Sequence, residues 1–266
     1  PNAATLVPAA AAGPLVDRVR RGFGVFAPAV ITPWACGGFR RCRKRSSFRV
    51  IVREARMLKV WGRVNSVNVK KVLWMLDELG IAYDRVDAGM EHGVVNDAPY
   101  RAMNPNGRVP TIEDDGFVLW ESNSVLRYLA MKHGNALYPV DPAARASADR
   151  WMDWQLSSLS PAERNLFWGM VRTAPDKRDM GAVTAAAKAA GECWAMLDEH
   201  IARHGGPFID GAAMTIADIV LGCYARRWFG PEVRVDGMPE FAALAGWSAA
   251  IGERPGFQRW VAVPMS

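Results

Sequence analysis

The order in which strand and helix patterns follow one another after residue 57 constrains the fold most. A short apolar strand, Leu58–Gly62, comes first. The next segment repeats apolar residues at helical spacing, at Val69, Val72, Leu73, Leu76 and Leu79. Gly80 is the expected end of this helix, and Ile81–Val86 is a second strand. A strand, a helix and a strand in this order predict two parallel strands joined by a right-handed crossover.

A hairpin and a further helix complete this first part of the chain. Val109–Ile112 and Phe117–Trp120 have the pattern of strands, and the residues EDDG between them predict a turn. Pro99–Asn104 is a short helix or an irregular loop, and Ser124–Lys132 is a helix that ends near Gly134. The resulting order, βαβ followed by ββα, is the thioredoxin-like arrangement.

Only helical patterns follow the linker Gly134–Pro139. Asp141 is the expected N-cap and Pro142 the first residue of a long helix. Three more helical segments are GAVTAAAKAAGECWAMLDEHIARHG, MTIADIVLGCYARRWF and MPEFAALAGWSAAIGERPGF. The predicted fold class is therefore α/β plus all-α. A thioredoxin-like N-terminal domain at residues 57–134 precedes an all-helical C-terminal domain at residues 141–266.

The net charge of +6 is concentrated in the first 56 residues. That segment holds 11 Lys and Arg but only Asp17 and Glu54 as acids, a net charge of +9. The remainder holds 22 basic and 25 acidic residues, and is therefore slightly acidic. Its charge gives no reason to expect nucleic-acid binding.

Residues 1–56 have three interpretations. The segment is rich in Ala and Pro, shows no helix or strand period, and includes the basic run RRCRKR at Arg40–Arg45. It could be an organelle transit peptide, which is Arg-rich and acid-poor, or a nuclear-import or nucleic-acid patch. We favour a third interpretation, an upstream stretch translated from a wrongly chosen start, because Met57 directly precedes a strand. A real extension of this composition would be disordered.

Several classes of protein do not fit the composition. No stretch approaches the roughly 18–20 uncharged apolar residues that span a bilayer. Four Cys are too few for a disulfide scaffold, which favours reduced thiols and a cytoplasmic protein. Cys193 and Cys223 fall in apolar helices, where we expect them to be buried and unreactive. Among the His residues only His200 and His204 are closely spaced, at a helix C-terminus where cations are favoured, so we predict no metal site.

Four segments follow one another in the order WGRVNSVNVKKVLWMLDELG, NPNGRVPTIEDDG, LWESNSVLRYLA and TIADI. In this order they resemble the cytosolic glutathione S-transferase superfamily, in particular its bacterial theta-like group. The resemblance covers residues 57–266 and implies that glutathione binds the first domain as co-substrate. The loop RVNSVN contains no Cys, so the dithiol exchange of a thioredoxin is not expected at this position.

The resemblance implies glutathione contacts at three places besides the thiol. The Val109–Pro110 bond is cis in the family and turns the backbone of Val109 toward the cysteinyl backbone of glutathione. Ser122, at a helix N-terminus, suits the γ-glutamyl carboxylate, and Glu121 suits the adjacent ammonium. The alternatives are a trans Pro that begins an edge strand and a plain N-cap without a ligand. Arg108 would face the glycyl carboxylate or be a solvated loop residue.

Ser66 is the candidate for activating the glutathione thiol. It lies between the first strand and the first helix, where a hydroxyl and the helix dipole can stabilise a thiolate. The alignment of VKKV with the family motif places Ser66 at the catalytic serine of theta- and delta-like enzymes. The usual Ser-Pro-Cys-Arg run is replaced by Ser-Val-Asn-Val, which leaves Asn65 and Asn68 as possible thiol contacts. A helix-capping residue with no ligand is the alternative.

The helical domain holds one structural motif and a candidate pocket. Thr215 and Asp218 match a capping box, for which we expect a role in stability and none in chemistry. Phe167, Trp168 and Arg172 lie at the far end of the first long helix, where members of the family line the site of the electrophile.

These features together predict a glutathione transferase that conjugates the glutathione thiolate to an electrophilic small molecule. The family is usually dimeric, so a homodimer is expected, and neither a membrane nor a nucleic acid is an expected partner. The same fold could instead serve a glutathione-dependent isomerase, dehalogenase or peroxidase, or a non-catalytic interaction protein. Nucleic-acid recruitment by residues 1–56 would require an affinity that falls when they are deleted and depends on salt.

Overall fold

A four-stranded sheet organises the N-terminal part of the described residues. The computed structural model describes residues 57–134 and 136–266, so the predictions for residues 1–56 lie outside it. The strands are β1 (Leu58–Trp61), β2 (Tyr83–Val86), β3 (Thr111–Asp114) and β4 (Phe117–Trp120), in the spatial order β2-β1-β3-β4. β1 is parallel to β2 and antiparallel to β3, and β3 is antiparallel to β4. The predicted thioredoxin-like topology is confirmed.

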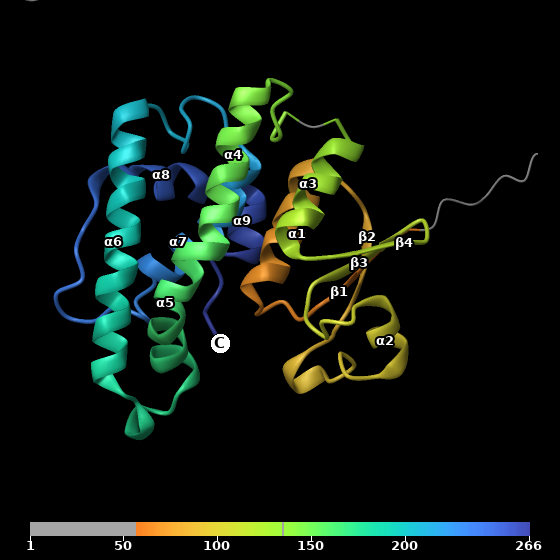
Figure 1. Cartoon of the computed structure of the whole chain (residues 1–266), viewed down its shortest axis with the longest axis horizontal. Helices are drawn as coiled ribbons and strands as arrows, with labels where there is room; N and C mark the ends of the chain where they lie inside the picture. Colours follow the sequence, from red (N-terminus) through yellow and green to blue (C-terminus); the bar gives the residue numbers. More distant parts are fainter. Residues whose placement is uncertain (1–56, 135) are drawn as a thin grey trace, which may run out of the picture. The chain divides into compact units, whose positions relative to one another are not determined.

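Two helices cover one face of this sheet and separate it from the helical part, as Figure 1 shows. They are α1 (Val67–Leu79) and α3 (Ser122–Lys132). Val60 and Ile112 point to these helices and are fully buried, because alternate residues of a strand face opposite sides. α1 ends at Gly80, which has the left-handed conformation (φ 64°) of a helix C-cap. α2 (Ala98–Met103) lies at the end of the sheet, after the 3₁₀ turn η1 (Met90–His92).

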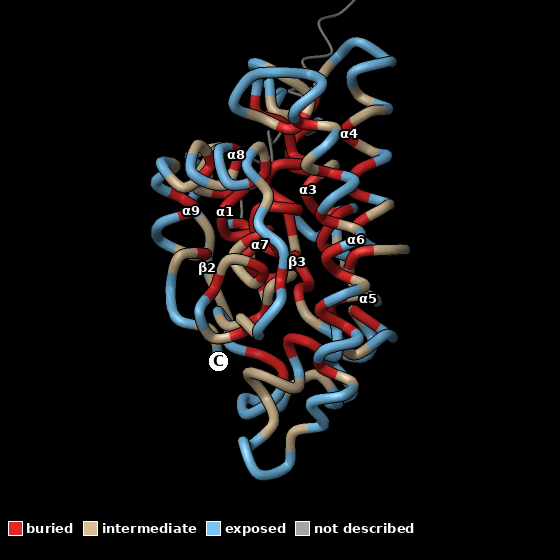
Figure 2. The backbone as a smooth tube through the Cα atoms, turned by 90° about the vertical axis from the view of Figure 1, so that its left-hand side faces the viewer, coloured by how far each residue is buried: buried red, intermediate tan, exposed pale blue. Residues whose placement is uncertain are grey.

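The C-terminal part is helical. Its α-helices are α4 (Pro142–Trp154), α5 (Ser160–Phe167), α6 (Met180–His204), α7 (Ile216–Phe229), α8 (Ala242–Gly252) and α9 (Pro255–Trp260). The predicted N-cap is confirmed, since Asp141 Oδ2 accepts a hydrogen bond from the Ala144 N–H at 2.8 Å. α7 packs against α1, α4 and α8 and is buried along most of its length, as the red tube in Figure 2 shows.

The predicted capping box at the start of α7 is also confirmed, and it does more than cap the helix. Asp218 Oδ2 accepts from the Thr215 N–H at 2.7 Å, and Thr215 Oγ1 accepts from the Ala217 N–H. Asp218 Oδ1 also accepts from the Ile209 N–H at 3.0 Å and from Trp247 Nε1 at 2.8 Å. The fully buried carboxylate therefore ties α7 to α8 and to the preceding loop.

Some element boundaries differ from the predictions. β3 begins at Thr111 rather than Val109, because Pro110 has no N–H to donate to a sheet ladder. The hairpin turn consists of only Asp115 and Gly116, whose φ angles of 51° and 88° fit a tight two-residue turn. α3 begins at Ser122, one residue after a strand, rather than at Ser124.

The helix predicted from Pro142 onward is interrupted. Two π-helical segments, η2 (Gln155–Leu159) and η3 (Trp168–Arg172), flank α5. Pro161 lies in the first turn of α5 and cannot donate a backbone hydrogen bond to the turn before it. The wider turn of η2 therefore accommodates this proline without ending the helix.

The last helix anchors α1 to the helical part. The indole of Trp260 donates to Asp77 Oδ2 at 2.8 Å, and the rings of Trp74 and Phe257 meet edge to face with centroids 5.3 Å apart. Arg254 forms an ion pair with Glu78. These contacts hold α1, with Ser66 at its N-terminal end, against α9.

Candidate functional site

The register of the sheet brings three predicted segments to one edge. Trp61, the last residue of β1, is opposite Thr111, the first residue of β3. Thr111 is in turn opposite Trp120, the last residue of β4. The loop that ends at Ser66, the Val109–Pro110 pair and the Glu121–Ser122 pair directly follow or precede these residues. All three segments therefore meet at the same edge, beside the N-terminal ends of α1 and α3.

Ser66 occupies the N-cap position of α1, but its side chain makes no capping hydrogen bond. Its backbone is extended (φ −85°, ψ 123°), and the residue is 8% exposed. Within the described residues its hydroxyl has no hydrogen-bond partner, so it is free to donate to a ligand. The first N–H groups of a helix lack intrahelical acceptors and favour negative charge. This position therefore suits an anion.

The two asparagines beside Ser66 face different neighbours. Asn65 Nδ2 donates to Ser266 Oγ at 3.2 Å, whereas Asn65 Oδ1 is buried and has no partner among the described residues. Asn68 Oδ1 accepts from Ser122 Oγ at 3.4 Å. Asn68 thus connects the first turn of α1 to the first residue of α3, and Asn65 leaves an acceptor available next to Ser66.

The segment before β3 is held by residues that the sequence analysis missed. The Val109–Pro110 bond is cis. The Tyr100 hydroxyl and Asn104 Nδ2 both donate to the Arg108 carbonyl, at 2.7 and 2.9 Å. Asn104 Nδ2 also lies 2.9 Å from Thr111 Oγ1. The sequence feature that could have identified Asn104 is its position at the start of the turn cluster NPNG. The Arg108 side chain is exposed and has no partner in the described part of the chain.

Glu121 and Ser122 form the third segment. Glu121 has a φ of 70°, a conformation that costs a non-glycine residue about 1–3 kcal/mol and that clusters at functional sites. Its carboxylate is exposed, with Asn106 Nδ2 3.5 Å from Oε1. Ser122 is 4% exposed, and its hydroxyl lies at the start of α3. Together they offer an anion and a helix N-terminus within one residue of each other.

A partly buried cation that the sequence analysis did not single out lies in the loop after β1. Arg63 Nε is buried without a hydrogen-bond partner among the described residues. Burial and then the nearby charge of Arg172 lower the pKa of the Arg63 guanidinium. Its only sequence signal was a basic residue directly after the strand.

A small pocket opens on the helical side of Ser66. Its lining includes Asn65, Lys70, Phe167, Cys223, Arg226 and Arg227. Phe167 lines this pocket, whereas Trp168 is 48% exposed and Arg172 is not among the lining residues. Burial raises the pKa of the Cys223 thiol to about 12, so this thiol stays protonated and is not a nucleophile. Cys193 is only partly buried, so the expectation that it would be buried was wrong.

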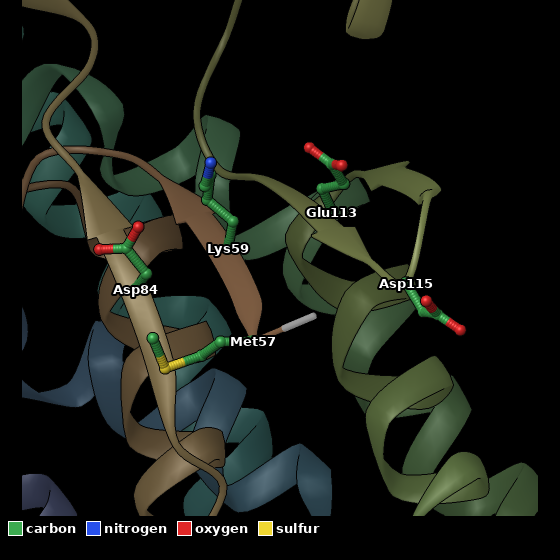
Figure 3. Close-up of a pocket in the computed structure, with 5 residues that line it drawn as sticks. All are labelled: Met57, Lys59, Asp84, Glu113 and Asp115. Carbon is green, nitrogen blue, oxygen red and sulfur yellow. The ribbon is translucent and has the colours of Figure 1, made fainter. Parts of the chain in front are cut away.

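Other features of the described residues do not add to this site. Figure 3 shows a hollow on the sheet face opposite α1 and α3, where Lys59 lies between Asp84 and Glu113. No group of three or more His, Cys, Asp or Glu side chains in residues 57–134 and 136–266 could hold a metal ion. His200 bonds Asp210 at 2.9 Å. None of the helices described is long and apolar enough to cross a membrane.

Comparisons with known proteins agree on one family. The model of the glutathione S-transferase N-terminal domain matches residues 56–131, and that of the C-terminal domain matches residues 180–250. Glutathione S-transferase GstB of Escherichia coli (strain K12) is 39% identical over 213 residues, which cover 79% of this chain and 100% of GstB.

Solved structures give the same result. A theta class glutathione S-transferase from Xanthomonas axonopodis pv. citri, with glutathione bound, has a TM-score of 0.74 and 42% identity, covering 79% of this chain and 99% of its own. A glutathione S-transferase from Pseudomonas fluorescens has a TM-score of 0.67 and 26% identity, covering 79% and 99%. The chain therefore belongs to the glutathione S-transferase superfamily, as a member similar to its bacterial theta-like group.

Proposed function

We propose that this protein is a glutathione transferase that joins the thiolate of glutathione to an electrophilic carbon of a small molecule. The observation that carries the proposal is the meeting of Ser66, Val109 and Ser122 at one edge of the sheet. A tripeptide with two carboxylates, an ammonium and a thiol needs several separate polar contacts. The residues at this edge supply hydroxyl groups, a backbone N–H and C=O, a carboxylate and a guanidinium, which match these parts of the tripeptide in charge and hydrogen bonding.

In this proposal each end of glutathione has its own binding residues. Ser122 and the N-terminal N–H groups of α3 bind the γ-glutamyl carboxylate, and Glu121 binds the adjacent ammonium. The backbone of Val109 pairs with the cysteinyl backbone. Arg108, exposed and unpaired among the described residues, binds the glycyl carboxylate as a two-fold donor.

Ser66 is the proposed activator of the thiol. A thiol with a pKa of about 8.5 is only a few per cent ionised at pH 7. Lowering that pKa by about two requires roughly 2.7 kcal/mol of preferential stabilisation of the thiolate. One hydroxyl hydrogen bond to the charged sulfur and the N-terminal end of α1 can supply this amount. Asn65 Nδ2 has a second N–H besides the one donated to Ser266, and this N–H can donate a further hydrogen bond to the thiolate.

The proposed reaction is a substitution at carbon. The thiol proton leaves to solvent when the thiolate forms. The sulfur then attacks the electrophilic carbon, a sulfur–carbon bond forms, and the leaving group departs as an anion with the electron pair of the broken bond. The protein contributes by ionising the sulfur and by holding both reactants in place.

An ultraviolet difference titration of the glutathione thiolate on the full chain tests the proposal, with Ser66→Ala alongside. We expect the bound thiol to ionise well below pH 8.5 and to lose this shift in Ser66→Ala. A shift that survives the substitution would transfer the role to Asn65, Asn68 or the helix terminus. Binding without ionisation, or no binding, would contradict the transferase and favour a non-catalytic interaction protein.

Product analysis separates conjugation from the related activities. Halide, ketone and peroxide substrates would distinguish a conjugating enzyme from a dehalogenase, an isomerase or a peroxidase. The proposed role is detoxification in the cytoplasm, and the proposed assembly is a homodimer. The exposed rings and side chains on β4 and α3, including Phe117 and Met131, favour such an interface. Light scattering on the full chain measures the assembly directly.

A further inference from the structure

Lys70 is a largely buried lysine whose ammonium group has no ion-pair partner among the described residues. It lies in the first part of α1 and is 7% exposed. No hydrogen bond or ion pair joins its Nζ to another of the described residues, and it lines the pocket beside Ser66. An ammonium group on a largely buried side chain that reaches a pocket without an ion-pair partner is a candidate for binding an anion.

The two arginine side chains that line this pocket are already paired. Arg226 forms a two-fold contact with Glu232, at 3.0 and 3.2 Å, and this contact lowers the pKa of the carboxyl to about 2. Arg227 Nη1 donates to the buried Glu163 Oε1 at 2.9 Å. Each arginine therefore has a carboxylate as an ion-pair partner. Among the charged side chains that line this pocket, Lys70 is the one without an ion-pair partner in the described part of the chain.

The position of Lys70 separates it from the proposed glutathione contacts. The Lys70 N–H donates to the Ser66 carbonyl at 2.9 Å, so the two residues lie one helical turn apart. The contacts proposed for the two carboxylates of glutathione lie at Arg108 and Ser122, on the segments next to β3 and β4. Lys70 instead shares its pocket with Phe167 and the paired arginines on the helical side. A group bound there would be attached to the second substrate.

We propose that Lys70 binds an anionic group, in particular a carboxylate, on the electrophile that the thiolate attacks. This inference rests on the proposed function, and it defines the substrate class as small electrophiles that carry a negative charge. Phe167, whose ring stacks under the Arg227 guanidinium at 3.8 Å, supplies an apolar wall for the uncharged part of such a molecule. The carboxylate takes no part in the bond changes and only orients the reacting carbon.

A pair of benzylic chlorides tests the inference. 4-(Chloromethyl)benzoate and 4-methylbenzyl chloride share the same reacting carbon and leaving group, but only the first carries a charge. In both, the thiolate sulfur bonds to the benzylic carbon and chloride departs with the electron pair. The ratio of their kcat/KM values is measured at saturating glutathione, on the full chain and on Lys70→Met, which keeps the length of the side chain and removes its charge.

We expect Lys70→Met to lower the ratio of the charged to the neutral substrate by about 10- to 100-fold, the range of one charge-assisted hydrogen bond. Lys70→Arg should restore a substantial part of it. Lys188→Met, which removes an exposed lysine of α6, should leave the ratio unchanged. An unchanged ratio in Lys70→Met would overturn the inference. An equal loss for both substrates, with a raised pKa of the bound thiol, would also overturn it, because Lys70 would then act on glutathione.

A binding measurement separates this inference from the proposed function. 4-Methylbenzoate cannot react, and its affinity for the full chain can be measured by calorimetry in the presence of glutathione. Weaker binding to Lys70→Met than to the unsubstituted chain, by at least tenfold, would support the anion site even if neither chloride were conjugated. Equal binding to both would refute it. If neither chloride reacts, that result contradicts the proposed transferase activity but not the proposed anion site.

Discussion

Lys71 is a fully buried amine whose hydrogen-bond partners are neutral. The pH dependence of stability therefore tests whether burial lowers its pKa. Its Nζ donates to Gln155 Oε1 at 2.8 Å and to Asn123 Oδ1 at 3.2 Å, and it lies 5.1 Å from the centre of the Tyr224 ring. These contacts join α1 to α3 and to η2. Burial lowers the pKa of Lys71 from 10.5 to about 7. The folded protein therefore releases a proton that the unfolded chain keeps.

The direction of the pH effect follows from this difference. Between pH 7 and 10.5 the unfolded chain binds more protons at Lys71 than the folded protein does, so stability rises with pH in this window. With pKa values of about 7 and 10.5, the gain from pH 7.5 to pH 9.0 is about 2 kcal/mol. Below pH 7 both states are protonated, and the charged amine then destabilises the fold.

Urea unfolding of the full chain and of Lys71→Met at pH 7.5, 8.25 and 9.0 measures this gain. The free energy of unfolding of the unsubstituted protein should rise by about 2 kcal/mol more than that of Lys71→Met. Other groups also contribute in this window, such as the Cys223 thiol, which ionises in the unfolded chain but stays protonated in the folded protein, where burial raises its pKa to about 12. They contribute equally to both proteins, so the difference isolates Lys71.

Lys188→Met is the matched control, because it removes an exposed lysine and should follow the pH dependence of the unsubstituted protein. Parallel curves for Lys71→Met and the unsubstituted protein would refute the reasoning. That result would mean that Lys71 keeps its proton in the folded state despite its burial.

Two further predictions concern packing and hydrogen bonding. Asp218→Ala removes a fully buried acceptor of four hydrogen bonds and should lower the free energy of unfolding by about 2–4 kcal/mol in urea titration. The exposed Asp236→Ala should change it by less than about 0.5 kcal/mol, and similar losses in the two variants would contradict this role. Gly222→Ala places a methyl group 2.8 Å from Ile251 Cδ1 and 2.9 Å from Trp74 Cζ3, and should destabilise the protein by about 1–3 kcal/mol. Gly246→Ala, on a helix surface with no atom within 4 Å, should raise the melting temperature instead.

Much of the fold could be predicted because its signals are local. The helix α1 followed from apolar spacing and from Gly80, and α7 followed from the pair Thr215 and Asp218. The parallel pairing of β1 and β2 followed from the helix between them. Predicted helix boundaries were less accurate where local sequence preferences did not decide the structure. At Pro161, for example, the helix continues through a π-helical turn instead of ending.

The site could be predicted only in part. Ser66, Val109 and Ser122 were proposed from the resemblance to the family, and the register brings the segments that carry them to one edge of the sheet. The supports of the site were missed, since Tyr100 and Asn104 act through contacts with the Arg108 carbonyl that no periodicity shows. Their roles require knowledge of which loops approach each other.

The sequence alone determined the order of elements, the helix ends and the segments next to the strand ends, because capping, periodicity and turn chemistry act over a few residues. Only the tertiary structure decided the surroundings of Lys70 and Lys71. These neighbours lie on one helix, yet one lines a pocket and the other bonds Gln155, 84 positions away in the chain. Burial and charge pairing depend on groups brought together from distant positions, and these groups decide the pKa and the ligand of each amine.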